Sequence, residues 1–79
     1  MSKRPSKNNI SLLGAHRIIV DGSSSRVDDD AAEELRVILE RIGISISKQA
    51  AELAHHAGRK TVKPSDISLA TTMVFGKKV

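Results

Sequence analysis

Basic side chains are the residues of this sequence best suited to do chemistry, because they gather at its two ends. Residues 1–20 carry a net charge of +4, residues 21–57 carry −4, and residues 58–79 return to +4. Clustered cations attract anionic partners, although a run of charge is by itself more often only a solvated face. The segregation therefore indicates an anionic partner only if the fold brings the basic segments onto a binding surface.

Other reactive side chains lack the spacing that catalysis or metal binding needs. His55 and His56 are adjacent, so on a helix they point in different directions, and the chain has no cysteine. The serines at 23–25 lie in turn-forming sequence without a positioned base. Residues 28–30 are three aspartates that could mimic a magnesium site, but the start of a helix explains them better. We expect no enzyme activity, no metal and no cofactor.

Length and composition indicate one small domain that needs support from another chain. At 79 residues a lone hydrophobic core is marginal, and without cysteine neither a disulfide nor a Cys-ligated zinc can reinforce it. The sequence shows no apolar run of the roughly 18 to 20 residues that cross a membrane, and no signal peptide. These features predict a soluble cytoplasmic protein with no membrane partner.

Helical periodicity predicts an all-α protein with three helices. The central one spans about Asp28 to Ala57, where apolar residues recur at a mean step near 3.6. This stripe consists of Leu35, Leu39, Ile42, Ile46, Ala50, Leu53 and Ala57. Shorter apolar faces predict helices over about Ile10–Val20 and from Pro64 to about Val74. Residues 21–25 predict a turn, and Gly58 predicts the end of the long helix. An alternation over residues 42–47 would suit a strand, but the helical stripe continues on both sides of it.

The central helix is too long for the globule that this chain could build alone. About 30 helical residues span roughly 45 Å, whereas a compact chain of this size is near 30 Å across. The apolar stripe runs the whole length of the helix, so both of its ends need cover. We therefore predict an obligate dimer in which two long helices cross.

Two stretches of the sequence resemble the histone fold, and specifically the small archaeal histones. They are RIIVDGSSSRVDDDAAEEL (residues 17–35) and LAHHAGRKTVKPSDISLA (residues 53–70), within a match that covers roughly Gly14 to Ala70. The resemblance implies an intertwined handshake dimer of short–long–short helices that wraps double-stranded DNA with little sequence specificity. It also implies a chromosome-associated location in the archaeal nucleoid.

The resemblance further assigns roles to individual residues. Those expected to face DNA are Arg17, Arg26, Lys60, Thr61 and Lys63. An intrachain salt bridge is implied between Arg59 and Asp66. The surface by which neighbouring dimers join is implied at Leu53, His56, Asp66 and Leu69. Lack of aromatic residues other than Phe75 argues against a stacking platform for single strands or RNA.

Several points differ from the simplest archaeal members or stay open. Residues 1–9 predict a flexible basic tail ahead of a histone-fold domain at 10–79. Val20 replaces a residue that is often basic, and Ser23 replaces a glycine used in close stacking of dimers. The sequence leaves open homodimers against pairing with a paralogous histone, and tetramers against higher stacked oligomers. The alternative function is a histone-fold subunit that heterodimerises within a transcription-related assembly.

Overall fold

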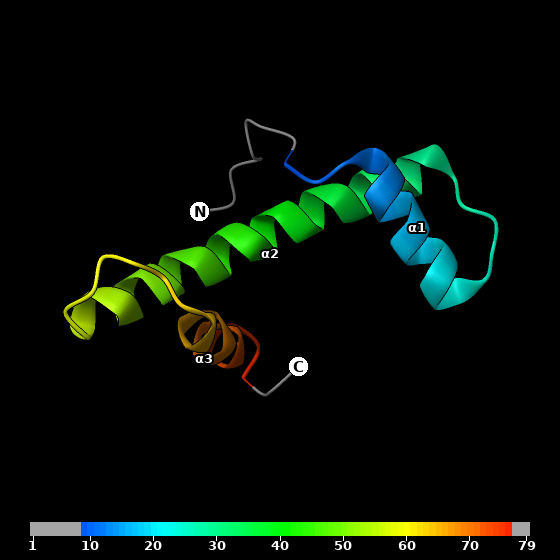
Figure 1. Cartoon of the computed structure of the whole chain (residues 1–79). Coiled ribbons are helices and arrows are strands. Elements are labelled where there is room, and N and C mark those ends of the chain that lie inside the picture. The colour runs from blue at the N-terminus through cyan, green and yellow to red at the C-terminus, as the bar shows by residue number, and fades with distance from the viewer. Residues whose placement is uncertain (1–8, 77–79) are drawn as a thin grey trace. The chain divides into compact units, whose positions relative to one another are not determined.

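The computed structural model describes residues 9–76, and this part of the chain contains three helices and no strand (Figure 1). Helix α1 spans Leu12–Ser23, α2 spans Asp29–His56 and α3 spans Pro64–Phe75. The predicted all-helical, short–long–short order is confirmed. Apart from Asn9, the predicted basic tail lies outside the described residues. The chain divides into two compact units, the first ending at Ile42 and the second beginning at Gly43.

Helix α1 is fixed at both ends by serine residues. Ser11 caps the start, where its Oγ accepts the Gly14 N–H at 2.9 Å, and a Cβ at Gly14 would lie only 3.0 Å from that oxygen. Ser24 ends the helix in the left-handed conformation, with φ of 55°, and donates its N–H to the Val20 carbonyl at 2.8 Å. The predicted end at Val20 was therefore three residues too early.

The helix continues past Val20 because the residue that ends it in the left-handed C-cap conformation is Ser24. The Ser23 hydroxyl donates to the Ile19 carbonyl at 2.6 Å, and so provides a side-chain partner inside the last turn. Gly22 is helical despite the turn signal, since a single glycine costs a helix only about 1 kcal/mol. The turn is thereby confined to residues 24–28.

Helix α2 has 28 residues, a length of about 42 Å, and includes the stretch that could have alternated as a strand. Asp29 and Asp30 stand in its first turn, where negative charge is favourable next to the helix dipole. The Ala31 and Ala32 N–H groups donate to the Asp28 backbone carbonyl, at 3.0 and 3.1 Å. The helix begins at Asp29, within one residue of the predicted start at about Asp28, so this prediction is confirmed.

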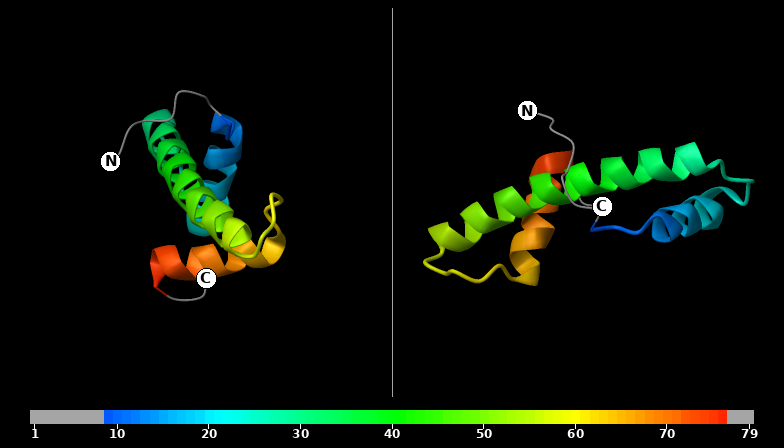
Figure 2. Two further views of the ribbon diagram at one scale, coloured as in Figure 1. Left: turned by 90° about the vertical axis from the view of Figure 1, so that its left-hand side faces the viewer. Right: turned by 90° about the horizontal axis from the view of Figure 1, so that it is seen from above.

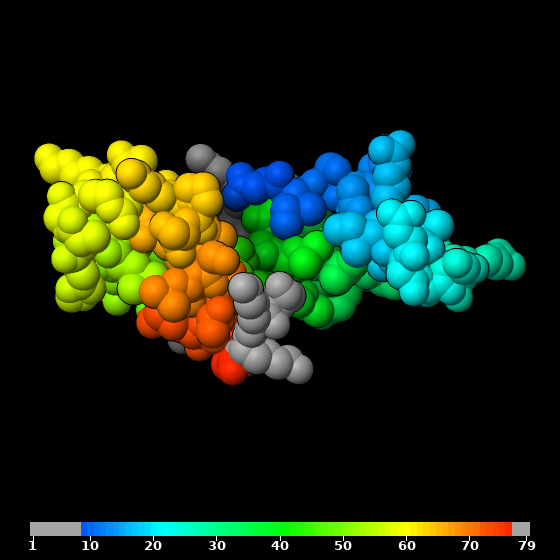
Figure 3. Space-filling view, turned by 60° about the horizontal axis from the view of Figure 1, so that its bottom comes forward, coloured from blue at the N-terminus to red at the C-terminus, as the bar shows by residue number. Residues whose placement is uncertain are grey.

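The two units have the same kind of core, made almost entirely of alanine. In the first unit, α1 lies beside the first half of α2 (Figures 2 and 3). In the second unit, α3 crosses the second half of α2 (Figure 2). The buried apolar residues of the two units are Ala15, Ala32 and Val37, and Ala50, Ala54 and Ala70. Small side chains allow helices to approach closely, but they bury little apolar area.

Larger apolar side chains remain at the surface. Among the described residues none of the large side chains is fully buried, and twelve large hydrophobic residues are exposed. These residues are Leu12, Leu13, Ile18, Val20, Ile38, Ile44, Val62, Ile67, Leu69, Met73, Val74 and Phe75. Five residues of the predicted stripe on α2, Leu35, Leu39, Ile42, Ile46 and Leu53, are half-buried. The periodicity thus identified an apolar face correctly, but this chain alone covers that face only in part.

Replacing Ser11 by alanine tests the cap that starts α1. Because Ser11→Ala removes the acceptor of the Gly14 N–H, we expect the free energy of unfolding to fall by about 1 kcal/mol. Ser11→Asp keeps an acceptor at this position and should retain wild-type stability. Urea unfolding followed by circular dichroism measures both variants. An equal loss in the two would show that the serine stabilises the helix by something other than capping.

Candidate nucleic-acid interface

The loop between α2 and α3 is held in one conformation by the end of the helix before it. Gly58 adopts a left-handed φ of +74°, as its position in the sequence predicted. Its N–H donates to the His55 carbonyl, and the Arg59 N–H donates to the Ala54 carbonyl, both at 2.9 Å. This is the double hydrogen bond of a Schellman motif. It sets the direction in which the Arg59 side chain leaves the backbone.

Arg59 then ties the loop to the first turn of α3. Its Nη1 donates to Asp66 Oδ2 at 2.8 Å and its Nη2 to Oδ1 at 3.0 Å, so the pair is bidentate. Nη1 also donates to the Thr61 carbonyl at 2.9 Å, and Asp66 Oδ2 accepts the Lys63 N–H at 2.8 Å. The salt bridge implied by the resemblance is therefore present. It fixes both ends of the loop through a single carboxylate.

The charge of Asp66 is strongly stabilised by these partners. The hydrogen bonds from Arg59, and next the one from the Lys63 backbone, lower the pKa of Asp66 to about 2, although burial opposes the shift. The hydrogen bonds that Arg59 donates to Asp66 raise the pKa of Arg59, although burial opposes this shift too. Because this carboxylate is only 5 % exposed, its charge is directed into the loop rather than toward solvent.

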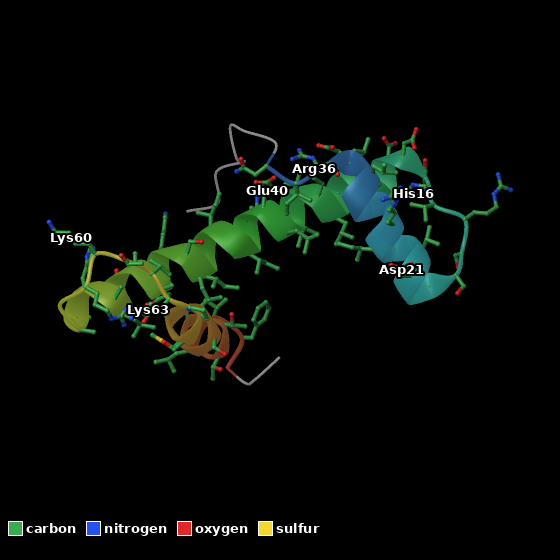
Figure 4. The ribbon with its side chains drawn as sticks, viewed as in Figure 1. His16, Asp21, Arg36, Glu40, Lys60 and Lys63 are labelled. Atoms are coloured by element: carbon green, nitrogen blue, oxygen red, sulfur yellow. The ribbon has the colours of Figure 1, made fainter. Side chains whose placement is uncertain are left out.

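On its outer side the loop presents polar and basic groups to solvent. Lys60, Thr61 and Lys63 are all exposed, and Lys60 extends away from the loop (Figure 4). Pro64 begins α3 directly after Lys63. Three of the five residues expected to face DNA are therefore displayed together on one short loop.

The other two expected DNA-facing residues belong to the first unit. Arg17 is exposed on α1, the helix on which Figure 4 labels His16 and Asp21. Arg26 is exposed in the loop of residues 24–28. Ser25 of this loop is hydrogen-bonded to Ser23, the last residue of α1. The Ser25 N–H donates to Ser23 Oγ at 3.3 Å, and Ser25 Oγ donates to the Ser23 carbonyl at 3.2 Å. Both arginines are thus available to an anionic partner.

The residues expected to join neighbouring dimers all lie in the second unit. His56 and Leu69 are exposed, and Leu69 is 52 % exposed, whereas Leu53 is half-buried. Asp66 differs from the other three because its carboxylate already accepts hydrogen bonds from Arg59 and Lys63. Any contact that it makes with another dimer must therefore be added to an occupied carboxylate.

Sequence reasoning missed a second charged cluster, on the first half of α2. Arg36 and Glu40 are both buried, and Arg36 donates to Glu33 through Nε and Nη2, at 3.0 and 2.8 Å. Glu40 accepts the backbone N–H of Ile10 and the side-chain amide of Asn9. The i, i+3 and i, i+4 spacing of Glu33, Arg36 and Glu40 was a visible signal for ion pairs on one helix. The spacing gave no indication that Glu40 would also accept the N–H of Ile10, thirty positions earlier in the chain.

The described part of the chain offers neither a cluster of metal ligands nor a membrane span. Between residues 9 and 76 no three His, Asp or Glu side chains are grouped so that they could hold a metal ion. No helix in this range is both long and apolar enough to cross a membrane.

Acidification of the protein tests the Arg59–Asp66 pair. Since folding lowers the pKa of Asp66 from 3.8 to about 2, its contribution to stability is complete above about pH 4 and is lost as pH falls toward 2. We expect Asp66→Asn to lower the melting temperature at pH 7 by several degrees and to show a smaller decline between pH 4 and pH 2. Thermal melts across this range compare it with Glu52→Gln, a change at an exposed position. Parallel curves for Asp66→Asn and wild type would contradict the assignment.

Comparison with known proteins agrees with the arrangement of helices and loops. Residues 15–71 match the family of histone-like transcription factors (CBF/NF-Y) and archaeal histones. The chain is 48 % identical over 54 residues to a subunit of archaeal histone HAN1 from Thermococcus zilligii, a stretch that covers 68 % of this chain and 81 % of that protein. With the same coverage it is 37 % identical to probable archaeal histone 3 of Methanocaldococcus jannaschii. The chain therefore belongs to the family of histone-like transcription factors and archaeal histones.

Proposed function

We propose that this protein is a non-enzymatic histone that dimerises and wraps or compacts double-stranded DNA with little sequence specificity. The observation that carries the proposal is the loop of residues 57–63, which the Arg59–Asp66 pair holds so that Lys60, Thr61 and Lys63 are exposed together. Membership of the family supports the same conclusion. In the cell this function corresponds to a place on the chromosome, in the nucleoid of an archaeal cytoplasm.

The chemistry of the loop suits the DNA backbone rather than the bases. Duplex DNA carries one negative charge for about every 1.7 Å of its axis, so exposed lysines and arginines supply most of the affinity. Lys60 and Lys63 provide charge, and the Thr61 hydroxyl provides a neutral donor to phosphate. Arg26 and Arg17 add exposed guanidinium groups, of the kind that enters the minor groove where histones wrap DNA. None of these interactions requires a particular base sequence.

A dimer is proposed because the described part of the chain has only a small core, made of short side chains. Its buried apolar residues are five alanines and one valine, whereas twelve large hydrophobic residues are exposed. A small domain with so little buried apolar area needs another chain to complete its core. We propose that a second copy covers these side chains in a handshake dimer. Association of dimers into tetramers or stacked oligomers would use Leu53, His56, Asp66 and Leu69.

A second candidate function follows from the breadth of the family. The matching family includes histone-like transcription factors, and one relative is named as a subunit. The same exposed apolar surface would suit a paralogous histone in place of a second copy. In that case the protein would be a heterodimeric subunit of a transcription-related assembly, and its loops would bind DNA weakly or not at all.

Substitution of the basic loops tests DNA binding. Arg26→Ala combined with Lys60→Ala removes two cations from the loops, so the plot of log affinity against log salt should flatten by about 0.9 for each phosphate that is no longer neutralised. Random-sequence duplex titrated at several salt concentrations measures this slope. The matched control is Arg41→Ala with Lys48→Ala, which removes the same charge from exposed positions on α2. Equal effects of the two pairs would contradict the assignment of the loops, and no binding by the wild type at low salt would favour the second function.

Dilution tests the dimer. At micromolar concentration we expect light scattering to give twice the chain mass of 8.5 kDa. Because dissociation would expose the apolar residues that the partner covers, the melting temperature should fall as the protein is diluted. A monomer that keeps full helicity and a constant melting temperature would show that the chain needs no partner.

A further inference from the structure

Three residues of α1 share the face that points away from the core of the first unit. Leu13, Arg17 and Val20 follow one another at steps of four and three residues, so they are neighbours on the helix surface. Ala15, the buried residue of α1, is two positions from both Leu13 and Arg17, which is about 200° around the helix. Leu13 is 57 % and Val20 38 % exposed, and Arg17 is exposed between them. The outer face of α1 is therefore an arginine with an apolar side chain on either side.

The other exposed apolar residues of α1 lie on the side of the helix that faces the core. Leu12 and Ile18 are each three positions from Ala15, so they lie within about 60° of it and border the contact with α2. A second copy that extends the small core can cover them there. Leu13 and Val20 are too far around the helix to border that contact. We therefore separate these two residues from the exposed hydrophobic residues that a second copy is proposed to cover.

Arg17 decides what kind of partner suits the outer face. Within residues 9–76 no carboxylate forms an ion pair with its guanidinium, not even that of Asp21 one helical turn away. An apolar protein surface laid over this face would bury the charge without a counter-charge, which is strongly unfavourable. Duplex DNA instead supplies phosphates along its whole length. The partner that fits must offer negative charge and apolar surface side by side.

The minor groove of DNA offers both kinds of surface. Phosphates form its edges, and its walls are deoxyribose rings that present C–H groups. Proteins that bind in this groove use arginines together with apolar side chains. Leu13 and Val20 are seven residues apart, about 10 Å along α1, and the groove is about 6 Å wide. Two apolar side chains at this separation can reach the sugars of both strands while the arginine between them enters the groove.

We propose that the outer face of α1 binds across the minor groove, with Leu13 and Val20 packed against the deoxyribose of the two strands on either side of Arg17. This inference rests on the proposed function and adds to it a contact that is not electrostatic. Apolar contact releases no counterions, so it persists when salt weakens the lysine and arginine contacts. The protein thus holds DNA by two kinds of interaction that respond differently to salt.

Salt titration of duplex binding separates the apolar contact from charge. Leu13→Ala combined with Val20→Ala removes apolar groups but keeps the net charge, and alanine favours a helix at least as well as the residues it replaces. We expect the affinity for random-sequence duplex to fall about tenfold at every salt concentration, so the plot of log affinity against log salt is displaced without a change of slope. Arg17→Ala should instead flatten the plot, because it removes a cation.

The matched control removes similar groups from the other side of the same helix. Leu12→Ala combined with Ile18→Ala changes the residues that border α2, so we expect its melting temperature to fall steeply on dilution. The duplex affinity of its intact dimer should be unchanged. We expect Leu13→Ala with Val20→Ala to keep the wild-type mass in light scattering and a melting temperature no lower than that of the wild type.

The outcomes separate this inference from the proposed function. If the wild type binds duplex and Leu13→Ala with Val20→Ala binds it equally well, or with an altered salt slope, the apolar contact is overturned and the proposed function stands. A lower mass or melting temperature for that variant would show that a second copy covers the outer face, which also overturns the inference. If the wild type binds no duplex even at low salt, the proposed function fails and the inference fails with it.

Discussion

The scarcity of buried apolar surface is the constraint on which the rest of this structure depends. Across residues 9–76 the core consists of alanines and Val37, because the larger apolar residues stay at least partly exposed. Alanine stabilises a helix well but contributes little hydrophobic burial. Each unit therefore relies on hydrogen bonds and ion pairs at its helix ends, and the proposed partner chain supplies the apolar cover.

The loop before α3 illustrates how helix ends replace a core. Gly58 can adopt the left-handed conformation, so the Arg59 backbone closes a Schellman motif, and the Arg59 side chain is delivered to Asp66. Asp66 lies in the first turn of α3 and holds the Lys63 N–H as well. The lysines on the outside of the loop thus owe their position to groups on its inside. Rigid presentation lowers the entropy that side chains lose on binding a partner.

Patterns local in sequence predicted the fold closely, whereas interactions between distant positions could not be predicted. The apolar repeat located α2, Gly58 located its end, and Pro64 located the start of α3. The Arg59–Asp66 pair was expected only through the resemblance to archaeal histones. The end of α1 was misplaced because Gly22 carries a turn signal but is helical, and the left-handed C-cap is Ser24. The hydrogen bond of Glu40 with Ile10 had no signal, since a helical ion-pair spacing does not reveal what a carboxylate oxygen reaches thirty positions away.

Ion pairs between side chains within each unit also explain how the acidic segment of residues 21–57 is compatible with an anionic partner such as DNA. Residues 21–57 carry a net charge of −4, which by itself would repel DNA. Part of that charge is taken up internally, because Glu33 and Glu40 face Arg36 in the first unit. In the second unit the one acid after residue 57, Asp66, is neutralised by Arg59. What the loop of residues 57–63 displays to a partner is then Lys60 and Lys63, with no acid to oppose them. The distribution of paired and unpaired charges, rather than the net value, makes this surface suitable for phosphate.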